Sequence, residues 1–147
     1  MPTTDIQKLR EMTGAGVMEC KRALDDAHGD FSQATKLIQE RGLAKAEKKA
    51  ARTAGAGLIE AYVHGGRVGV ILEIRAETDF VVRSEPFRAL SHDLAMHIAA
   101  MNPADVVALL AQPYVRDADT MVGDLVKGVI AKVGENIVVT RFCRYEL

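Results

Sequence analysis

The chain has 147 residues, enough for one ordinary domain or two small ones, and its hydrophobic content of 48% is that of a packed globular protein. Its 19 Lys and Arg residues nearly balance its 20 Asp and Glu residues, which excludes a general electrostatic attraction to nucleic acid or anionic membranes. The sequence has no signal-peptide pattern and no apolar run long enough to span a membrane, so we expect a cytoplasmic protein.

The first third of the chain has the pattern of three short helices. Apolar residues recur at helical spacing up to the break at residues 13–16, then from Val17 to about Ala27, and then from Phe31 to Gly42. Asp30 begins a capping-box pattern that opens the third helix. Residues 1–42 therefore predict a small three-helix bundle.

A charged segment, residues 43–52, follows the bundle. It is rich in Ala, Lys, Glu and Arg and has few side chains to bury, so we interpret it as a solvated helical linker. Contact of its basic residues, from Lys45 to Arg52, with RNA is the alternative interpretation. The change in composition places a domain boundary near Thr53, which gives residues 1–52 and 53–147 as the two domains.

Residues 53–147 have the pattern of an α+β domain. Two β-prone runs around Gly65-Gly66 predict a hairpin, and a third strand is expected at the end of the chain. Three helices are expected between the hairpin and the last strand. The second of them has Asn102 as its N-cap and Pro103 in its first turn. The expected ranges are strands 58–64, 67–75 and 136–145 and helices 86–101, 103–111 and 121–133. The order predicts a small, mostly antiparallel sheet with helices on one face.

The central motif, Glu77-Thr78-Asp79-Phe80-Val81, lies between the predicted hairpin and the first of these helices. The chain has only four Phe, three Tyr and no Trp, so a Phe in a connection needs a reason. In one interpretation Phe80 folds back into the core and Asp79 caps the turn or the helix. In the other, Asp79 and Phe80 project outward and bind a partner, as aromatic anchors do at interfaces.

No catalytic constellation is recognisable. The four histidines lack a Cys, Asp or Glu partner at metal-ligand spacing, and Ser91-His92-Asp93 is not a triad because neighbouring helical residues point apart. Cys20 and Cys143 are far apart and form no CxxC pair. No phosphate-binding glycine motif is present. We therefore expect no enzyme, no metal site and no cofactor.

Several strings resemble those of the elongation factor Ts family. The N-terminal string is Thr13-Gly14-Ala15-Gly16-Val17-Met18-Glu19-Cys20-Lys21, preceded by Leu9-Arg10 and followed by Ala23-Leu24. The central motif, His97-Ile98-Ala99-Ala100-Met101, Gly134-Glu135-Asn136-Ile137 and the last seven residues are also similar. These matches are collinear and cover nearly the whole chain.

The resemblance implies a guanine-nucleotide exchange factor for elongation factor Tu, with a ubiquitin-associated-like three-helix N-terminal domain. In that family the central motif disturbs the magnesium site of the GTPase, which assigns the role to Thr78, Asp79, Phe80 and Val81. The N-terminal domain docks on the GTPase, with Arg10, Val17, Met18 and Lys21 as the matching surface residues. The resemblance therefore favours the outward-facing interpretation of Phe80.

The chain is short beside many members of that family, which carry two related core subdomains and a helical excursion. We expect a single half-core to form a homodimer through its terminal sheet, with Cys143 at or near the interface. Two other functions are open at this stage. One is an interaction module that binds a partner without accelerating nucleotide release, and the other is an RNA-binding protein that uses residues 45–52.

Overall fold

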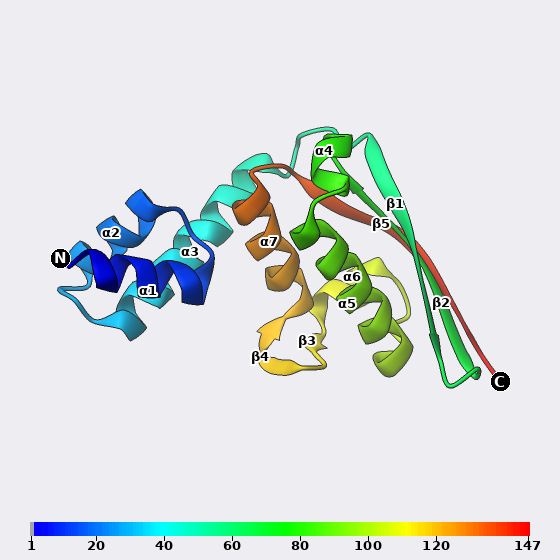
Figure 1. Cartoon of the computed structure of the whole chain (residues 1–147). Helices are drawn as coiled ribbons and strands as arrows, with labels where there is room; N and C mark the ends of the chain where they lie inside the picture. Colours follow the sequence, from blue (N-terminus) through cyan, green and yellow to red (C-terminus); the bar gives the residue numbers. More distant parts are fainter. Residues whose placement is uncertain (1) are drawn as a thin grey trace. The chain divides into compact units, whose positions relative to one another are not determined.

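The computed structural model describes residues 2–147, and the chain divides into two compact units, one ending at Lys45 and the other beginning at Ala46 (Figure 1). The division lies seven residues before the boundary expected from composition. Ala46, inside the charged segment, is 2% exposed and packs in the core of the second unit. The assignment of residues 1–52 and 53–147 to two separate domains stays a prediction.

The three predicted helices are present: α1 (Thr3–Thr13) and α2 (Val17–Asp26) lie in the first unit, and α3 (Phe31–Lys49) begins there and ends four residues past Lys45. The Asp30 carboxylate accepts the Gln33 N–H at 3.0 Å, so the predicted cap of the third helix is confirmed. A small core joins the helices, with Leu9, Cys20 and Leu24 fully buried. Gly42 does not end α3, because the Ala, Lys and Glu residues that follow it favour continued helix.

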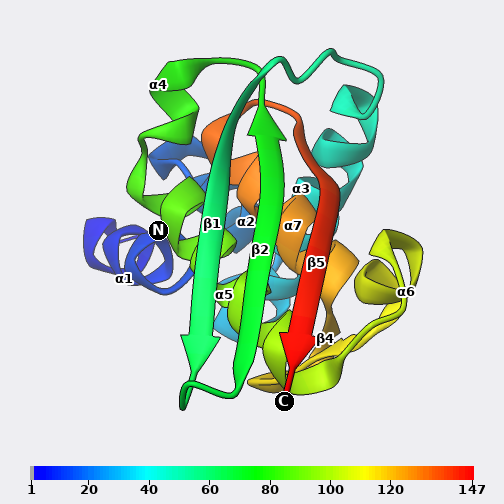
Figure 2. The ribbon, with the colours of Figure 1, turned by 90° about the vertical axis from the view of Figure 1, so that its right-hand side faces the viewer.

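The second unit is built on a three-stranded antiparallel sheet in the order β1-β2-β5 (Figure 2). Its strands are β1 (Ala56–His64), β2 (Val68–Ala76) and β5 (Ile137–Glu146). The predicted hairpin is confirmed: Gly65 and Gly66 have φ angles of 57° and 67°, and the Arg67 N–H bonds to the His64 carbonyl at 3.0 Å. Gly65 and Gly66 are the central residues of this turn, and positive φ at both positions suits glycine.

Helices cover one face of this sheet, which confirms the predicted α+β class (Figure 2). The main ones are α5 (Glu85–Met101) and α7 (Val122–Val133), with a short helix α6 (Val106–Ala111) between them in sequence. Phe87 and Leu94 of α5 pack on Leu72 and Ile74 of β2 in one apolar core. Among residues 2–147, no helix combines the length and the apolar character that a membrane span requires.

Two details between α5 and α7 differ from the expectation. Asn102 ends α5 instead of starting the next helix: its φ is 46° and its N–H bonds to the Ile98 carbonyl at 3.0 Å. Asn tolerates this left-handed conformation, and Asp105 takes over as the N-cap of α6. A two-stranded ribbon of β3 (Pro113–Tyr114) and β4 (Asp117–Met121) also follows α6. β3 has only two residues and β4 is largely polar, so neither has the apolar alternation that predicts a strand.

Candidate functional site

The central motif forms a single helical turn, α4 (Asp79–Val82), directly after β2. Thr78 precedes it in extended conformation, and its Oγ1 accepts the Val81 N–H at 3.4 Å as the N-cap. At the other end, the Ser84 hydroxyl donates to the Val81 carbonyl at 2.6 Å. A helix of four residues is not stable alone, so the surrounding contacts must hold it in place.

Phe80 points outward from this turn. Its side chain is 85% exposed, whereas Val81 and Val82, the next two residues, are 4% and 7% exposed and belong to the core. The interpretation in which Phe80 is a core anchor is therefore wrong, because the two valines take the inward positions of the turn. Asp79 is also exposed, and the residue that caps the helical turn is Thr78 instead of Asp79.

A carboxylate clasp of Glu77, Thr78, Glu135 and Asn136 holds the motif against the loop between α7 and β5. The β2–β5 ladder ends at the pair Ala76 and Ile137, and the clasp continues beyond it. Glu135 accepts the Thr78 N–H at 2.9 Å and its hydroxyl at 2.8 Å. Glu77 in turn accepts the Asn136 N–H at 2.8 Å. Side-chain carboxylates thus replace the backbone acceptors that a longer ladder would supply.

Asn136 fixes the far side of the clasp. It is 3% exposed, and its Nδ2 donates to the carbonyls of Arg52 at 2.8 Å and Ala50 at 3.4 Å. Arg52 also forms an ion pair with Glu77 at 3.7 Å. Sequence reasoning assigned no role to Glu135 or Asn136. The signal that could have revealed their role is the antiparallel pairing of β2 with β5, which brings residues 77–78 beside residues 135–136.

The candidate residues of the first unit flank the turn between α1 and α2. Arg10 lies in the last turn of α1, while Val17, Met18 and Lys21 lie in the first half of α2. Val17 and Met18 are 49% and 59% exposed, and Arg10 and Lys21 are exposed as well. Met12, in the last turn of α1, is a further apolar residue beside this turn and is 63% exposed, although no role was expected for it from the sequence. Exposed apolar side chains with basic neighbours are typical of an interaction surface.

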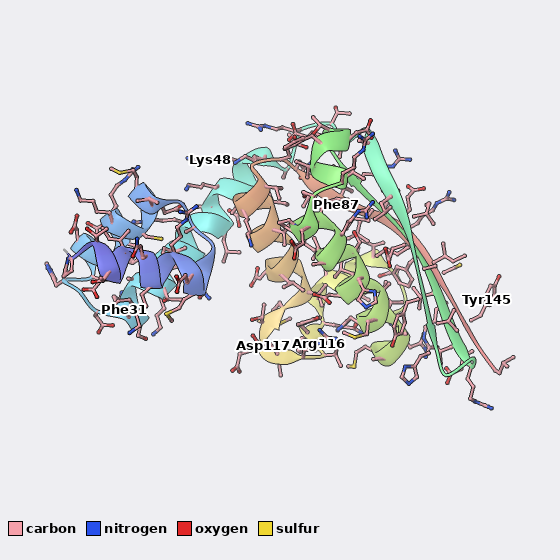
Figure 3. All side chains as sticks on the ribbon, in the orientation of Figure 1. Phe31, Lys48, Phe87, Arg116, Asp117 and Tyr145 are labelled. Carbon is pink, nitrogen blue, oxygen red and sulfur yellow. The ribbon has the colours of Figure 1, made fainter. Side chains whose placement is uncertain are left out.

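Cys143 lies on the outer face of the sheet, the side away from α5 and α7. On this face the strand register places it opposite Ile71, which is 51% exposed and has Ala61 on its other side. The next row joins Val63, Gly69 and Tyr145. Figure 3 shows the Tyr145 side chain pointing away from the helices. This outer face is therefore an exposed apolar patch near the end of the chain.

Charged residues border the patch toward the other end of the sheet. Glu73 forms ion pairs with Arg75 at 3.2 Å and with Arg141 at 3.3 Å. Partial burial of Glu73 opposes its ionisation, but hydrogen bonds and charge from Arg75 and then Arg141 outweigh it and hold the pKa of Glu73 below its ordinary value. The outer face thus combines an apolar area with a fixed charged border.

Within residues 2–147, no three His, Cys, Asp or Glu side chains gather in an arrangement that would hold a metal ion. His97 is fully buried and structural: its Nδ1 accepts the Val115 N–H at 3.1 Å, and its Nε2 lies 2.9 Å from Gln112 Oε1. The groups that the central motif exposes to solvent are the Phe80 ring and the adjacent Asp79 carboxylate.

Comparison with known proteins identifies the relatives. The family model described as elongation factor TS matches residues 30–106 and 77–147. The elongation factor Ts of Caldanaerobacter subterraneus subsp. tengcongensis is 41% identical over 96% of the chain and 94% of its own length. Those of Moorella thermoacetica and Alkaliphilus oremlandii are each 39% identical over 97% of the chain and cover 93% and 87% of their own lengths. The alignment with the Caldanaerobacter protein spans 187 positions, whereas this chain has 147 residues. At least 40 residues of that relative therefore have no counterpart in this chain.

Proposed function

Because the chain belongs to the elongation factor Ts family, we propose that it is a guanine-nucleotide exchange factor that acts on elongation factor Tu. It binds the GDP form of this GTPase, disturbs the magnesium site and promotes release of GDP, so that GTP can bind during translation elongation in the cytoplasm. The observation that carries this proposal is Phe80, which is 85% exposed on a turn whose neighbours are buried or hydrogen-bonded. A large apolar ring that is this exposed contributes little to the stability of its own chain.

Exchange of this kind needs no covalent chemistry and no acid–base pair. It needs the factor to bind the nucleotide-free GTPase more tightly than the GDP form, and linkage then makes factor and GDP weaken each other equally. Magnesium neutralises charge on the phosphates, so a group that disturbs its ligand shell weakens the hold on GDP. The protein is accordingly not an enzyme in the sense of bond-making chemistry, and it requires no cofactor of its own.

The four residues of the proposed contact have different tasks. The Phe80 ring enters a pocket of the GTPase, and the Asp79 carboxylate meets a donor at the rim of that pocket. Thr78 and Val81 act from within the chain, because Thr78 caps the turn and Val81 anchors it in the core. The contact is thus presented as a preorganised unit, which lowers the cost of ordering on binding.

We assign the docking of the first unit on the GTPase to Arg10, Val17, Met18 and Lys21. The exposed Met18 and Val17 side chains supply apolar contact area, and the two basic residues supply charge that orients the encounter. Met12 belongs to the same proposed surface because it is exposed on the other side of the turn.

The proposed second partner is another copy of the same chain. The outer sheet face exposes Ile59, Val63, Ile71 and Tyr145, and exposed apolar side chains grouped on one face favour an interaction surface. Pairing two such faces would bury these residues and place Cys143 of each copy at the interface. Sedimentation at micromolar concentration tests this proposal: a dimer supports it, and a pure monomer removes it.

Release of a fluorescent GDP from elongation factor Tu in millimolar magnesium tests the main proposal. The expected result is a large acceleration by this protein. Binding to the GTPase without acceleration would instead favour a plain interaction module. Binding to RNA with a steep salt dependence would favour the segment from Lys45 to Arg52 as the functional part.

A further inference from the structure

We infer that Glu135 is a positioning residue for nucleotide exchange: its carboxylate fixes the start of α4 and so presents Asp79 and Phe80 before the GTPase arrives. This inference rests on the proposed exchange function. Glu135 itself does not meet the nucleotide or the magnesium ion in this account. It acts through Thr78, to which both of its carboxylate oxygens are bonded.

The geometry gives Glu135 control of the N-cap. Its Oε2 accepts the Thr78 hydroxyl proton at 2.8 Å, so the lone pairs of the Thr78 hydroxyl oxygen are free to accept the Val81 N–H. Its Oε1 accepts the Thr78 N–H at 2.9 Å, which satisfies a further donor at the start of the turn. Both bonds have an ionised acceptor, and such bonds are stronger than those between neutral groups.

The position of Phe80 depends on Glu135 because the Phe80 ring makes few contacts of its own with the rest of the chain. Its ring is exposed, and α4 has only four residues. Val81 and Val82 anchor the second half of the turn in the core, whereas Asp79 and Phe80 form the first half, next to Thr78. Loss of the bonds to Thr78 would therefore loosen the half of the turn that carries the proposed contact residues, and leave the buried half in place.

The loop that carries Glu135 is itself fixed on both sides. Gly134 ends α7 with a φ of 78°, and its N–H bonds to the Ile130 carbonyl at 2.9 Å. Asn136 is buried and bonded to three partners, as described above. Glu135 thus holds α4 from a rigid junction of helix and strand, as a supporting residue must if it is to position another.

The first test measures GDP release as a function of factor concentration. Glu135→Ala should lower the limiting rate about fivefold, since hydrogen bonds to a charged acceptor are stronger than neutral ones but are weakened by solvent at this exposed site. The half-saturating concentration should change less than about twofold, because first contact is assigned to the other unit. Glu40→Ala, which removes an exposed carboxylate from α3, is the control and should match the parent.

A double-mutant cycle tests whether Glu135 acts through Thr78. In a Thr78→Val background the hydroxyl is already gone, so adding Glu135→Ala should slow release less than it does in the parent. Fully additive effects would overturn the inference. An unchanged limiting rate in Glu135→Ala, with the parent active, would also overturn it.

The second test needs no GTPase and separates this inference from the proposed function. The chain has no Trp, so Phe80→Trp places a single reporter on the turn. Adding Glu135→Ala to this variant should lower the fluorescence anisotropy of the introduced indole and speed hydrogen exchange of the Thr78 amide, while the thermal midpoint followed by circular dichroism shifts little. Unchanged anisotropy and amide exchange would overturn the inference. If the parent protein does not accelerate GDP release from elongation factor Tu, the proposed function is overturned. The anisotropy of the introduced indole would still decide whether Glu135 holds the turn.

Discussion

Phe80 and Val81 are neighbours in α4, and the structure predicts that replacing Val81 by Ala destabilises the fold whereas replacing Phe80 by Ala barely changes its stability. Val81 is 4% exposed, so Val81→Ala removes two buried methyl-sized groups, worth about 1.6 kcal/mol by transfer, and the cavity raises the cost to about 2 kcal/mol. Full burial of a Phe side chain contributes about 3 kcal/mol at most, so the roughly 15% of Phe80 that is covered contributes no more than about 0.5 kcal/mol. The higher helix propensity of Ala offsets part of that contribution.

Urea unfolding followed by tyrosine fluorescence measures both effects. All three tyrosines, Tyr62, Tyr114 and Tyr145, lie in the second unit, and no Trp interferes, so the signal reports the unit that contains α4. The expected free energy of unfolding is unchanged within about 0.5 kcal/mol for Phe80→Ala and lower by about 2 kcal/mol for Val81→Ala. Equal destabilisation by the two substitutions would mean that Phe80 packs against its own chain, and would refute the assignment of Phe80 to a partner contact.

Three further predictions concern other parts of the second unit. The Tyr114 hydroxyl is buried and has no hydrogen-bond partner within residues 2–147, so Tyr114→Phe should raise the free energy of unfolding by up to about 1 kcal/mol in a urea titration; a clear loss would contradict this. The pKa of Glu73 is below its ordinary value of 4.5 in the folded protein, so its ion pairs stabilise the fold above that pH and this contribution is lost as the pH falls through the folded pKa. Glu73→Gln should therefore flatten the decline of the urea midpoint in acid, and an unchanged acid dependence would contradict the assignment. Ile71→Lys places a charge in the centre of the outer sheet face and should convert the proposed dimer to monomer in sedimentation, whereas a dimer that persists would place the interface elsewhere.

Much of the fold follows from local sequence patterns. The two glycines at 65 and 66 predict the hairpin because few other residues adopt positive φ at both turn positions. Apolar residues at helical spacing predict α5 and α7 to within one residue of their observed starts. Asn102 shows where the pattern misleads, since Asn before Pro suits a helix start and Asn in left-handed conformation also suits a helix end.

The candidate site depended on information that local patterns do not hold. Phe80 and Val81 are both apolar, so composition alone does not tell which of them faces the core; the backbone of the turn decides it. The bonds from Thr78 to Glu135 join residues 57 positions apart, and they exist only because β2 pairs with β5. Contacts set by strand register in this way become visible once the fold is known.

The most direct test of the proposed exchange function is the rate of fluorescent GDP release from elongation factor Tu with the parent protein and with Phe80→Ala. We predict strong acceleration by the parent and a loss on the order of 2 kcal/mol, about thirtyfold in rate, in the variant. Val107→Ala, which removes another exposed apolar side chain from the same unit, serves as the control and should match the parent. Equal acceleration by the parent and Phe80→Ala would contradict the account.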